Sequence, residues 1–391
     1  MSFRPNSHTP HQAKPNGQRA EHRANAFKGT HVPRAATIHW QPPKTRDMKA
    51  LQELARKNIW QISPDETSLD NPGKDDARIF LDANEIPYNK PHNRYPDPWQ
   101  TKLKATLSQV KGVAPENIFL GNGSDEVIDM VYRVFCEPRR DNVVAIAPTY
   151  GTYKARADVN DVEYRAVPLS EGFRLDAQKT LAARDANTKV IWLCSPNDPT
   201  GNSLQQTEIE KIIMGFDGIV VIDEAYSDFS PAKLFRSEIG KHPNIIALNT
   251  MSKAWGRADI RLGMAFANEQ IVKLLNKVKL PYNINTLTQR HALDALEHRQ
   301  DVEKWVRMLL QERGQLMKAF EYLPICERVY PSDSNFFLAK MTDAQSIYKY
   351  LTEKGIAVKN ESDVELCENC LRVTVGTKSE NSELLGALRQ F

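Results

Sequence analysis

Residues 218–226 read GIVVIDEAY, and this stretch indicates how the main sheet of the protein is built. The run from Ile219 to Ile222 is apolar throughout, so neither side of a strand formed here carries polar side chains for solvent. Strands of this kind are typical of parallel sheets that helices cover on both faces. Asp223 and Glu224 follow directly, at the strand end where such sheets bind their ligands.

Similar apolar runs and helical patterns alternate on either side of this stretch. They predict an α/β fold whose large, mostly parallel sheet is covered by helices. After residue 280 the order of patterns predicts a smaller α+β part at the C-terminus. The predicted strands are 142–147, 189–194, 244–249, 335–340, 356–359 and 371–376, and the predicted helical segments are 124–135, 205–216 and 286–322.

The chain has 391 residues and a net charge of +3, and its composition is ordinary for a globular protein. Residues 1–47 are basic and polar, so a disordered tail is predicted there. The remainder is predicted to divide into an N-terminal arm and small-domain or interface segment (48–104), a large domain (105–280) and a small C-terminal domain (281–391). The basic residues of the tail are dispersed and lack interleaved aromatic residues, which argues against nucleic acid as a partner.

Location and metal content can also be predicted. The sequence contains no apolar window of about 18 residues, so no membrane span is expected. Five scattered cysteines, an odd number, favour reduced thiols and a cytoplasmic location. Cys367 and Cys370 form a CxxC motif, but no second pair or nearby histidine completes a zinc site, so no metal is predicted.

Polar segments of particular kinds stand at the ends of the predicted strands. A pyridoxal phosphate site needs a lysine to join the cofactor, an aspartate to keep the pyridine nitrogen protonated, and donors for the phosphate. The sequence offers these in SPNDPTG (195–201), EAYSDF (224–229), TMSKAWG (250–256) and LGNG (120–123), with Asp223 directly before the second segment. Together they predict a pyridoxal phosphate site at this edge of the sheet.

Five residues are assigned to the ring of the cofactor. Lys253 is the candidate for covalent attachment, and Asp223 is suited to pair with the pyridine nitrogen. Tyr226 and Asn197 are expected to donate to the phenolic oxygen, with Tyr150 stacked on the ring. Lys253, Asp223 and Tyr226 form the predicted catalytic set.

The cofactor phosphate is expected at the start of the helix that follows LGNG, because free N–H groups and the helix dipole favour an anion there. The predicted phosphate and cofactor contacts are Gly121, Gly123, Ser124, Asp125, Thr250, Ser252 and Arg261. Singly, each motif also fits an ordinary cap, salt bridge or β-turn. Their common order and strand-end placement favour the cofactor site.

The chain resembles the fold-type I pyridoxal phosphate-dependent aminotransferases and, among them, the histidinol-phosphate aminotransferases. This resemblance covers residues 48–391. The segments that carry it are LDANE (81–85), NRYPDP (93–98), GNGSDE (121–126), PTYGTY (148–153), SPNDPTGN (195–202), DEAY (223–226), SKAWGRADIRLG (252–263) and CLRVTVG (370–376).

The resemblance implies transamination between histidinol phosphate and 2-oxoglutarate in histidine biosynthesis, carried out by a cytoplasmic homodimer. By the same resemblance, Tyr95 contacts the cofactor phosphate of the partner subunit, and Arg372 binds the α-carboxylate of glutamate next to Asn335. Lys359 faces the substrate phosphate, and Asn84 completes the substrate set.

The sequence departs from the family pattern mainly at substrate positions. Lys359 stands where an arginine is usual, Ile86 replaces an amide, and a tyrosine expected in the arm is absent from 65–70. Arg257 and Asp259 put charges where small apolar residues are common. These departures leave open an aminotransferase for aromatic amino acids or an enzyme like the threonine-phosphate decarboxylases. A cofactor-binding protein without turnover is a further alternative, against which the joint presence of Lys253, Asp223 and Arg372 argues.

Overall fold

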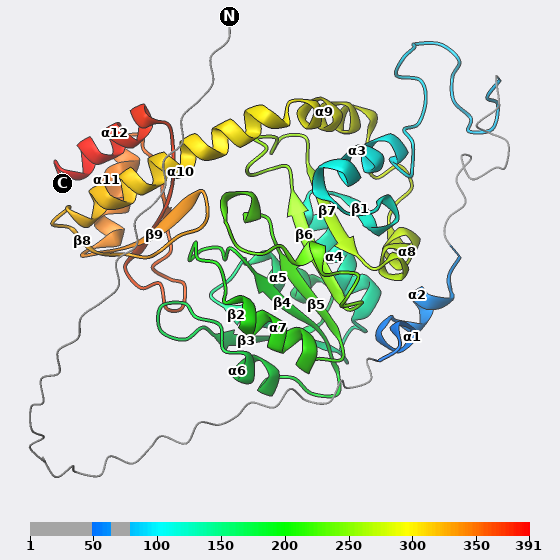
Figure 1. Cartoon of the computed structure of the whole chain (residues 1–391), viewed down its shortest axis with the longest axis horizontal. Coiled ribbons are helices and arrows are strands. Elements are labelled where there is room, and N and C mark those ends of the chain that lie inside the picture. Colours follow the sequence, from blue (N-terminus) through cyan, green and yellow to red (C-terminus); the bar gives the residue numbers. More distant parts are fainter. Residues whose placement is uncertain (1–48, 64–78) are drawn as a thin grey trace, which may run out of the picture. The chain divides into compact units, whose positions relative to one another are not determined.

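The computed structural model describes residues 49–63 and 79–391 (Figure 1). The predictions for the tail 1–47 and for the arm segment 65–70 lie outside these residues. In the described part of the chain, no helix combines the length and apolar character needed to cross a membrane. The division of the chain into four segments stays a prediction.

A large seven-stranded sheet forms the centre of the fold, with the strand order β1-β7-β6-β5-β4-β2-β3. The strands from β6 to β3 pair in parallel, whereas β7 is antiparallel to both of its neighbours. The predicted mostly parallel sheet is therefore confirmed. Its strands are β1 (Ile118–Asn122), β2 (Asn142–Ala147), β3 (Glu163–Pro168), β4 (Thr188–Cys194), β5 (Ile219–Asp223), β6 (Ile245–Thr250) and β7 (Leu262–Ala267).

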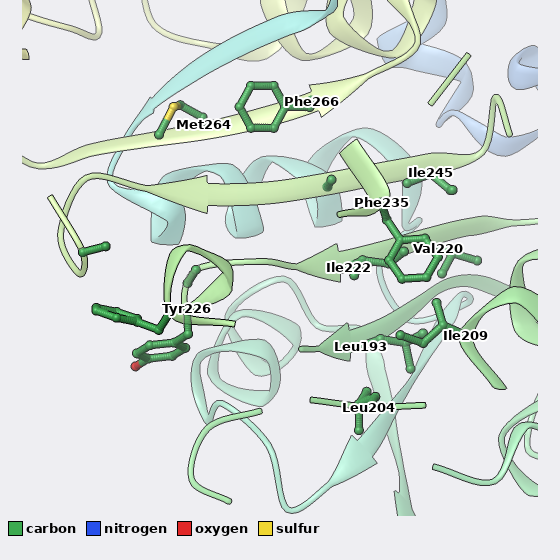
Figure 2. Packing of buried hydrophobic residues seen from close by; sticks show 14 of the residues in the cluster. Leu193, Leu204, Ile209, Val220, Ile222, Tyr226, Phe235, Ile245, Met264 and Phe266 are labelled. Atoms are coloured by element: carbon green, nitrogen blue, oxygen red, sulfur yellow. The ribbon is translucent and has the colours of Figure 1, made fainter. Parts of the chain in front are cut away.

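Helices pack on both faces of this sheet, which explains why its inner strands are apolar throughout. Along β5, Val220 and Ile222 join one buried cluster and Ile219 and Val221 join the other. Figure 2 shows Ile222 of β5 next to Leu193 of β4 in the first cluster. The first cluster contains residues of three helices, α3 (Thr101–Lys111), α7 (Gln206–Gly215) and α9 (Thr286–Glu297). The second cluster contains residues of five helices, α1 (Leu51–Leu54), α2 (Lys57–Gln61), α4 (Ser124–Phe135), α5 (Thr152–Val159) and α8 (Glu269–Val278). The short helix α6 (Ala177–Ala182) lies between β3 and β4 in the chain.

The C-terminal part contains a four-stranded antiparallel sheet in the order β10-β11-β9-β8. This confirms the predicted α+β fold of the part after residue 280. The predicted helical segment 286–322 is two helices, because the chain breaks at His298 between α9 and α10. The elements here are α10 (Arg299–Glu321), β8 (Cys326–Val329), β9 (Phe336–Met341), α11 (Ala344–Glu353), β10 (Lys359–Asn360), β11 (Cys370–Thr374) and α12 (Lys378–Leu388). Cys370 begins β11 and Cys367 lies in the turn before it, and both are buried free thiols.

Candidate active site

A pocket of about 470 Å³ lies where the ends of the large-sheet strands meet the small sheet. Six of the predicted site residues line it: Tyr150, Tyr226, Lys253, Asn335, Lys359 and Arg372. Its wall also includes residues that the sequence did not single out, namely Thr149, Gly151, Asp198, Pro199, Phe336, Glu361, Val364 and Thr374. Residues more than two hundred positions apart in the chain therefore face one cavity.

Lys253 lies in the loop that follows β6, and its Nζ stands 5.0 Å from the centre of the Tyr226 ring. The amide of Gly256 donates to the carbonyl of Lys253, which closes a turn around it. Lys253 lines the same pocket as Tyr226, which follows the end of β5.

Asp223 ends β5 and is almost fully buried. Its Oδ2 accepts a hydrogen bond of 2.8 Å from the Tyr153 hydroxyl, and its Oδ1 accepts one of 3.0 Å from the Ala225 amide. Burial raises the pKa of Asp223, and the hydrogen bond from Tyr153 is the largest effect that opposes this rise. No cation of the described residues forms an ion pair with Asp223 within 4.0 Å. A buried carboxylate with no adjacent cation is suited to a ligand that brings one.

The turn after β4 places Asp198, rather than Asn197, in the pocket wall. Asn197 is fully buried and donates both hydrogens of its amide within the protein, to the carbonyl of Pro148 and to Oγ1 of Thr200. The structure thus leaves no free donor for the predicted role of Asn197. The Tyr226 hydroxyl donates to Oδ2 of Asp198 over 3.0 Å.

The N-terminus of α4 forms a cradle for an anion. Gly123 precedes the helix with a φ of 82°, and an added Cβ there would lie 2.5 Å from Nη2 of Arg261. Asp125 accepts hydrogen bonds from Tyr150 (2.9 Å) and from Arg261 (3.2 Å), so it links the helix start to both residues. Ser124 is the first residue of the helix, whose N-cap makes no side-chain hydrogen bond. Free N–H groups and a guanidinium therefore surround this point.

Thr250 and Ser252 belong to the turn that carries Lys253. Oγ1 of Thr250 lies 3.0 Å from Oγ of Ser252 and accepts from the amide of Ser252. Thr250 also donates to the carbonyl of Leu262, which ties the turn to β7. Gly263 on β7 was not singled out by the sequence, although its position touches the helix start: an added Cβ would lie 2.2 Å from the Ser124 nitrogen.

Arg372 extends from β11 and is held by two carboxylates. Its Nη1 forms a short ion pair with Oδ1 of Asp198 and lies 3.3 Å from Oε1 of Glu361. Its guanidinium also lies over the ring of Phe336, 5.4 Å from the ring centre. Lys359 is the pairing partner of Arg372 on β10, so two cations stand side by side at the small sheet.

Tyr95 and Asn84 lie on the surface and do not line the pocket. Tyr95 is 57% exposed and stacks on Tyr282, with 4.6 Å between ring centres. Asn84 is also exposed and does not line the cavity. The two departures after Lys253 lie outside the pocket wall as well, and Arg257 pairs with Asp294 over 3.1 Å.

The residues present fit pyridoxal phosphate. The cradle at α4 suits its phosphate, and the buried carboxylate of Asp223 suits a protonated ring nitrogen. Lys253 and Tyr150 line the pocket, and Tyr150 donates to Asp125 at the start of α4.

Comparisons with known proteins identify the family. The family model for aminotransferase class I and II matches residues 70–388. The histidinol-phosphate aminotransferase of Bacteroides fragilis is 57% identical over 344 residues, which is 88% of this chain and 100% of that protein. The corresponding protein of Parabacteroides distasonis is 52% identical over 344 residues, covering 88% and 99%. A crystal structure of the histidinol-phosphate aminotransferase from Clostridium acetobutylicum superposes with a TM-score of 0.71 at 21% identity, covering 77% of this chain and 91% of that one. The chain therefore belongs to the aminotransferase class I and II family, among the histidinol-phosphate aminotransferases.

Proposed function

We propose that this protein uses pyridoxal phosphate to transfer an amino group between histidinol phosphate and 2-oxoglutarate, in histidine biosynthesis. The observation that carries the proposal is the placement of Lys253, Tyr226, Arg372 and Lys359 around one pocket. A covalent lysine and two anion-binding cations are what this reaction requires of the protein. The similarity to the Bacteroides fragilis enzyme supports the same assignment.

Four residues hold the cofactor in this proposal. The helix start at Ser124 and the guanidinium of Arg261 bind the phosphate, while Asp223 accepts from the ring nitrogen. Tyr150 covers one face of the ring and is itself fixed by its hydrogen bond to Asp125. When bound, the cofactor supplies an electron sink for the substrate carbon that carries the amino group.

Lys253 moves the proton. Its Nζ in the neutral form accepts the proton from the substrate carbon and later returns it, acting first as general base and then as general acid. The Tyr226 ring lies beside this amine, and the Tyr226 hydroxyl is fixed by Asp198.

Arg372 and Lys359 bind the anionic groups of the substrates. The planar guanidinium of Arg372 suits the α-carboxylate of glutamate, and Asn335 lines the pocket next to it. Lys359 lies opposite Arg372 and suits the phosphate of histidinol phosphate as a point charge. Tyr95 and Asn84 serve the site of a second subunit in this proposal. The expected cytoplasmic location rests on the biosynthetic role and stays a prediction.

A half-reaction assay tests the proposal. Protein loaded with pyridoxal phosphate is mixed with glutamate while the cofactor absorbance is followed, and imidazole-acetol phosphate or phenylpyruvate is then added. We expect glutamate to convert the cofactor and imidazole-acetol phosphate to restore it. Restoration that is much faster with phenylpyruvate contradicts the substrate assignment and favours an aromatic amino acid aminotransferase.

The variant Lys253→Ala tests the chemistry separately. We expect loss of both half-reactions by at least about 100-fold, because the group that moves the proton is gone. The exposed Lys349→Ala on α11 is the matched control and should behave as the wild type. Turnover by Lys253→Ala at the wild-type rate contradicts the mechanism.

A further inference from the structure

Arg372, the cation assigned to the substrate carboxylate, is already paired with a carboxylate of the protein. Its side chain is 26% exposed and lines the pocket, and its Nη1 donates to Oδ1 of Asp198, which lines the same pocket. Oε1 of Glu361 lies 3.3 Å from the same Nη1. One guanidinium thus faces two carboxylates, so a third carboxylate that enters the pocket meets a cation whose charge is already neutralised.

Asp198 is held by a second contact that does not involve Arg372. Its other oxygen, Oδ2, accepts a hydrogen bond of 3.0 Å from the Tyr226 hydroxyl. The amide of Gly201 donates to the carbonyl of Asn197 over 2.7 Å, so the turn that carries Asp198 is closed by its own backbone. When a ligand takes over the guanidinium, only the Oδ1 contact of Asp198 has to break, and the carboxylate keeps one partner.

Glu361 does not hold Arg372 in the same way. Among the described residues, its Oε1 has no hydrogen-bond donor, although it lies within ion-pair distance of Nη1. Glu361 directly follows β10, whereas Asp198 lies in the turn after β4, so two separate segments place their charges beside the guanidinium. Of the two carboxylates, Asp198 is therefore the one that a ligand has to replace as the hydrogen-bond partner of Nη1.

We propose that Asp198 is an internal competitor for Arg372, which holds the guanidinium in the empty site and gives way to the α-carboxylate of the amino donor. This inference rests on the proposed function, in which Arg372 binds that carboxylate. The apparent affinity for a carboxylate is then lower than Arg372 alone would provide, because the free guanidinium is only a fraction of the population. Weaker binding also favours release of the dicarboxylate product, which has to leave before the second substrate enters the same pocket.

Calorimetry with succinate on full-length, cofactor-loaded protein tests this inference, since succinate carries two carboxylates but has no amine or keto group that reacts. We expect Asp198→Asn to tighten the Kd of succinate by about 10-fold, because a neutral amide competes less well than a carboxylate for a cation. Glu361→Gln is the matched control, since it removes a charge beside the same guanidinium but no hydrogen bond, and it should change the Kd less. Glu365→Ala removes an exposed acid and should match the wild type.

The sign of the change separates competition from a structural role. If Asp198 only orients Arg372, Asp198→Asn weakens succinate binding, so a weaker or unchanged Kd overturns the inference. Equal tightening by Asp198→Asn and Glu361→Gln means that net charge alone acts, which also overturns it. With glutamate as substrate, KM should fall in Asp198→Asn, and a KM that rises contradicts the competition. A wild type that binds succinate but does not aminate imidazole-acetol phosphate overturns the proposed function and not the competition, which succinate measures by itself.

Discussion

Tyr153 is a residue whose importance the sequence did not reveal. Its ring is stacked on Trp192 with 4.8 Å between centres, and Trp192 is stacked in turn on Tyr132. This packing fixes the Tyr153 hydroxyl against Asp223. The motif PTYGTY directed attention to Tyr150, and only the packing of α5 beside β4 distinguishes the second tyrosine as the partner of the carboxylate.

The variant Tyr153→Phe should make stability of the cofactor-free protein more sensitive to pH. Burial raises the pKa of Asp223, so the folded state binds that proton more tightly than the unfolded state does. The contribution of Asp223 to the free energy of unfolding is complete below the ordinary carboxyl pKa. It is lost as the pH rises through the pKa that Asp223 has in the folded state. Removing the hydroxyl raises that pKa further and should cost about 1–3 kcal/mol at neutral pH.

Urea unfolding from acid to neutral pH measures this effect. Tyr164→Phe serves as the control, because burial alone raises the pKa of Tyr164, to about 12. An unfolding profile of Tyr153→Phe that parallels the wild type at every pH contradicts a role for this hydroxyl.

At the level of elements, β7 decides how closely the sheet approaches the start of α4. It runs antiparallel to β6, so the chain returns from the Lys253 loop directly past Ser124. Only a glycine at position 263 permits this approach, because an added Cβ would meet backbone atoms of Gly123 and Ser124. Backbone cannot move aside as the end of a side chain can.

Gly263→Ala and Gly314→Ala should therefore have opposite effects. The first forces β7 and α4 apart and should lower the free energy of unfolding by about 2–3 kcal/mol or more. The second lies within α10, where an added Cβ meets nothing within 4 Å, and should raise it by about 1 kcal/mol. Urea titrations of both variants check this. A Gly263→Ala protein as stable as wild type, with unchanged cofactor affinity, contradicts the close approach.

The elements show what the sequence could and could not predict. The apolar run 142–147 coincides with β2, and the helical pattern 124–135 coincides with α4, because both are buried in a regular way. The edge strand β3 was missed, since its exposed side carries charged residues. Glu361 and Asp198 were missed for a different reason. Asp198 reaches Arg372 from a segment far away in the chain, and Glu361 reaches it where β10 pairs with β11, so no local pattern encodes either contact.

At the level of the whole molecule, large apolar side chains are exposed on two segments that lie together. The stacking of Tyr95 on Tyr282 joins these segments, and Gln289 donates to the carbonyl of Asp97. Exposed apolar surface of this extent is typical of an interaction site, and we propose that a second copy of the chain covers it. The exposed residues are Ile79, Leu81, Ile86, Tyr88, Tyr95, Leu280 and Leu287.

Mixing two inactive variants tests whether subunits share their sites. Lys253→Ala and Tyr95→Ala should each be impaired alone. After unfolding and refolding together, half of the dimers are mixed, and each mixed dimer has one site with both changes and one with neither. We expect about one quarter of wild-type activity from this symmetry. A mixture no more active than its components, with dimers confirmed by ultracentrifugation, contradicts a Tyr95 contribution across the interface.

The stacked Trp192 also serves as an intrinsic fluorescent probe of the site. Its indole is buried and stacked on the ring of Tyr153, whose hydroxyl donates to Asp223. We expect a bound group that absorbs near-ultraviolet light and lies against Asp223 to quench the fluorescence of Trp192 more than that of the half-exposed Trp305 on α10. The contribution of Trp192 to the protein fluorescence, obtained by comparison with a variant that lacks this tryptophan, should therefore fall as the site is filled. It reports occupancy without any label.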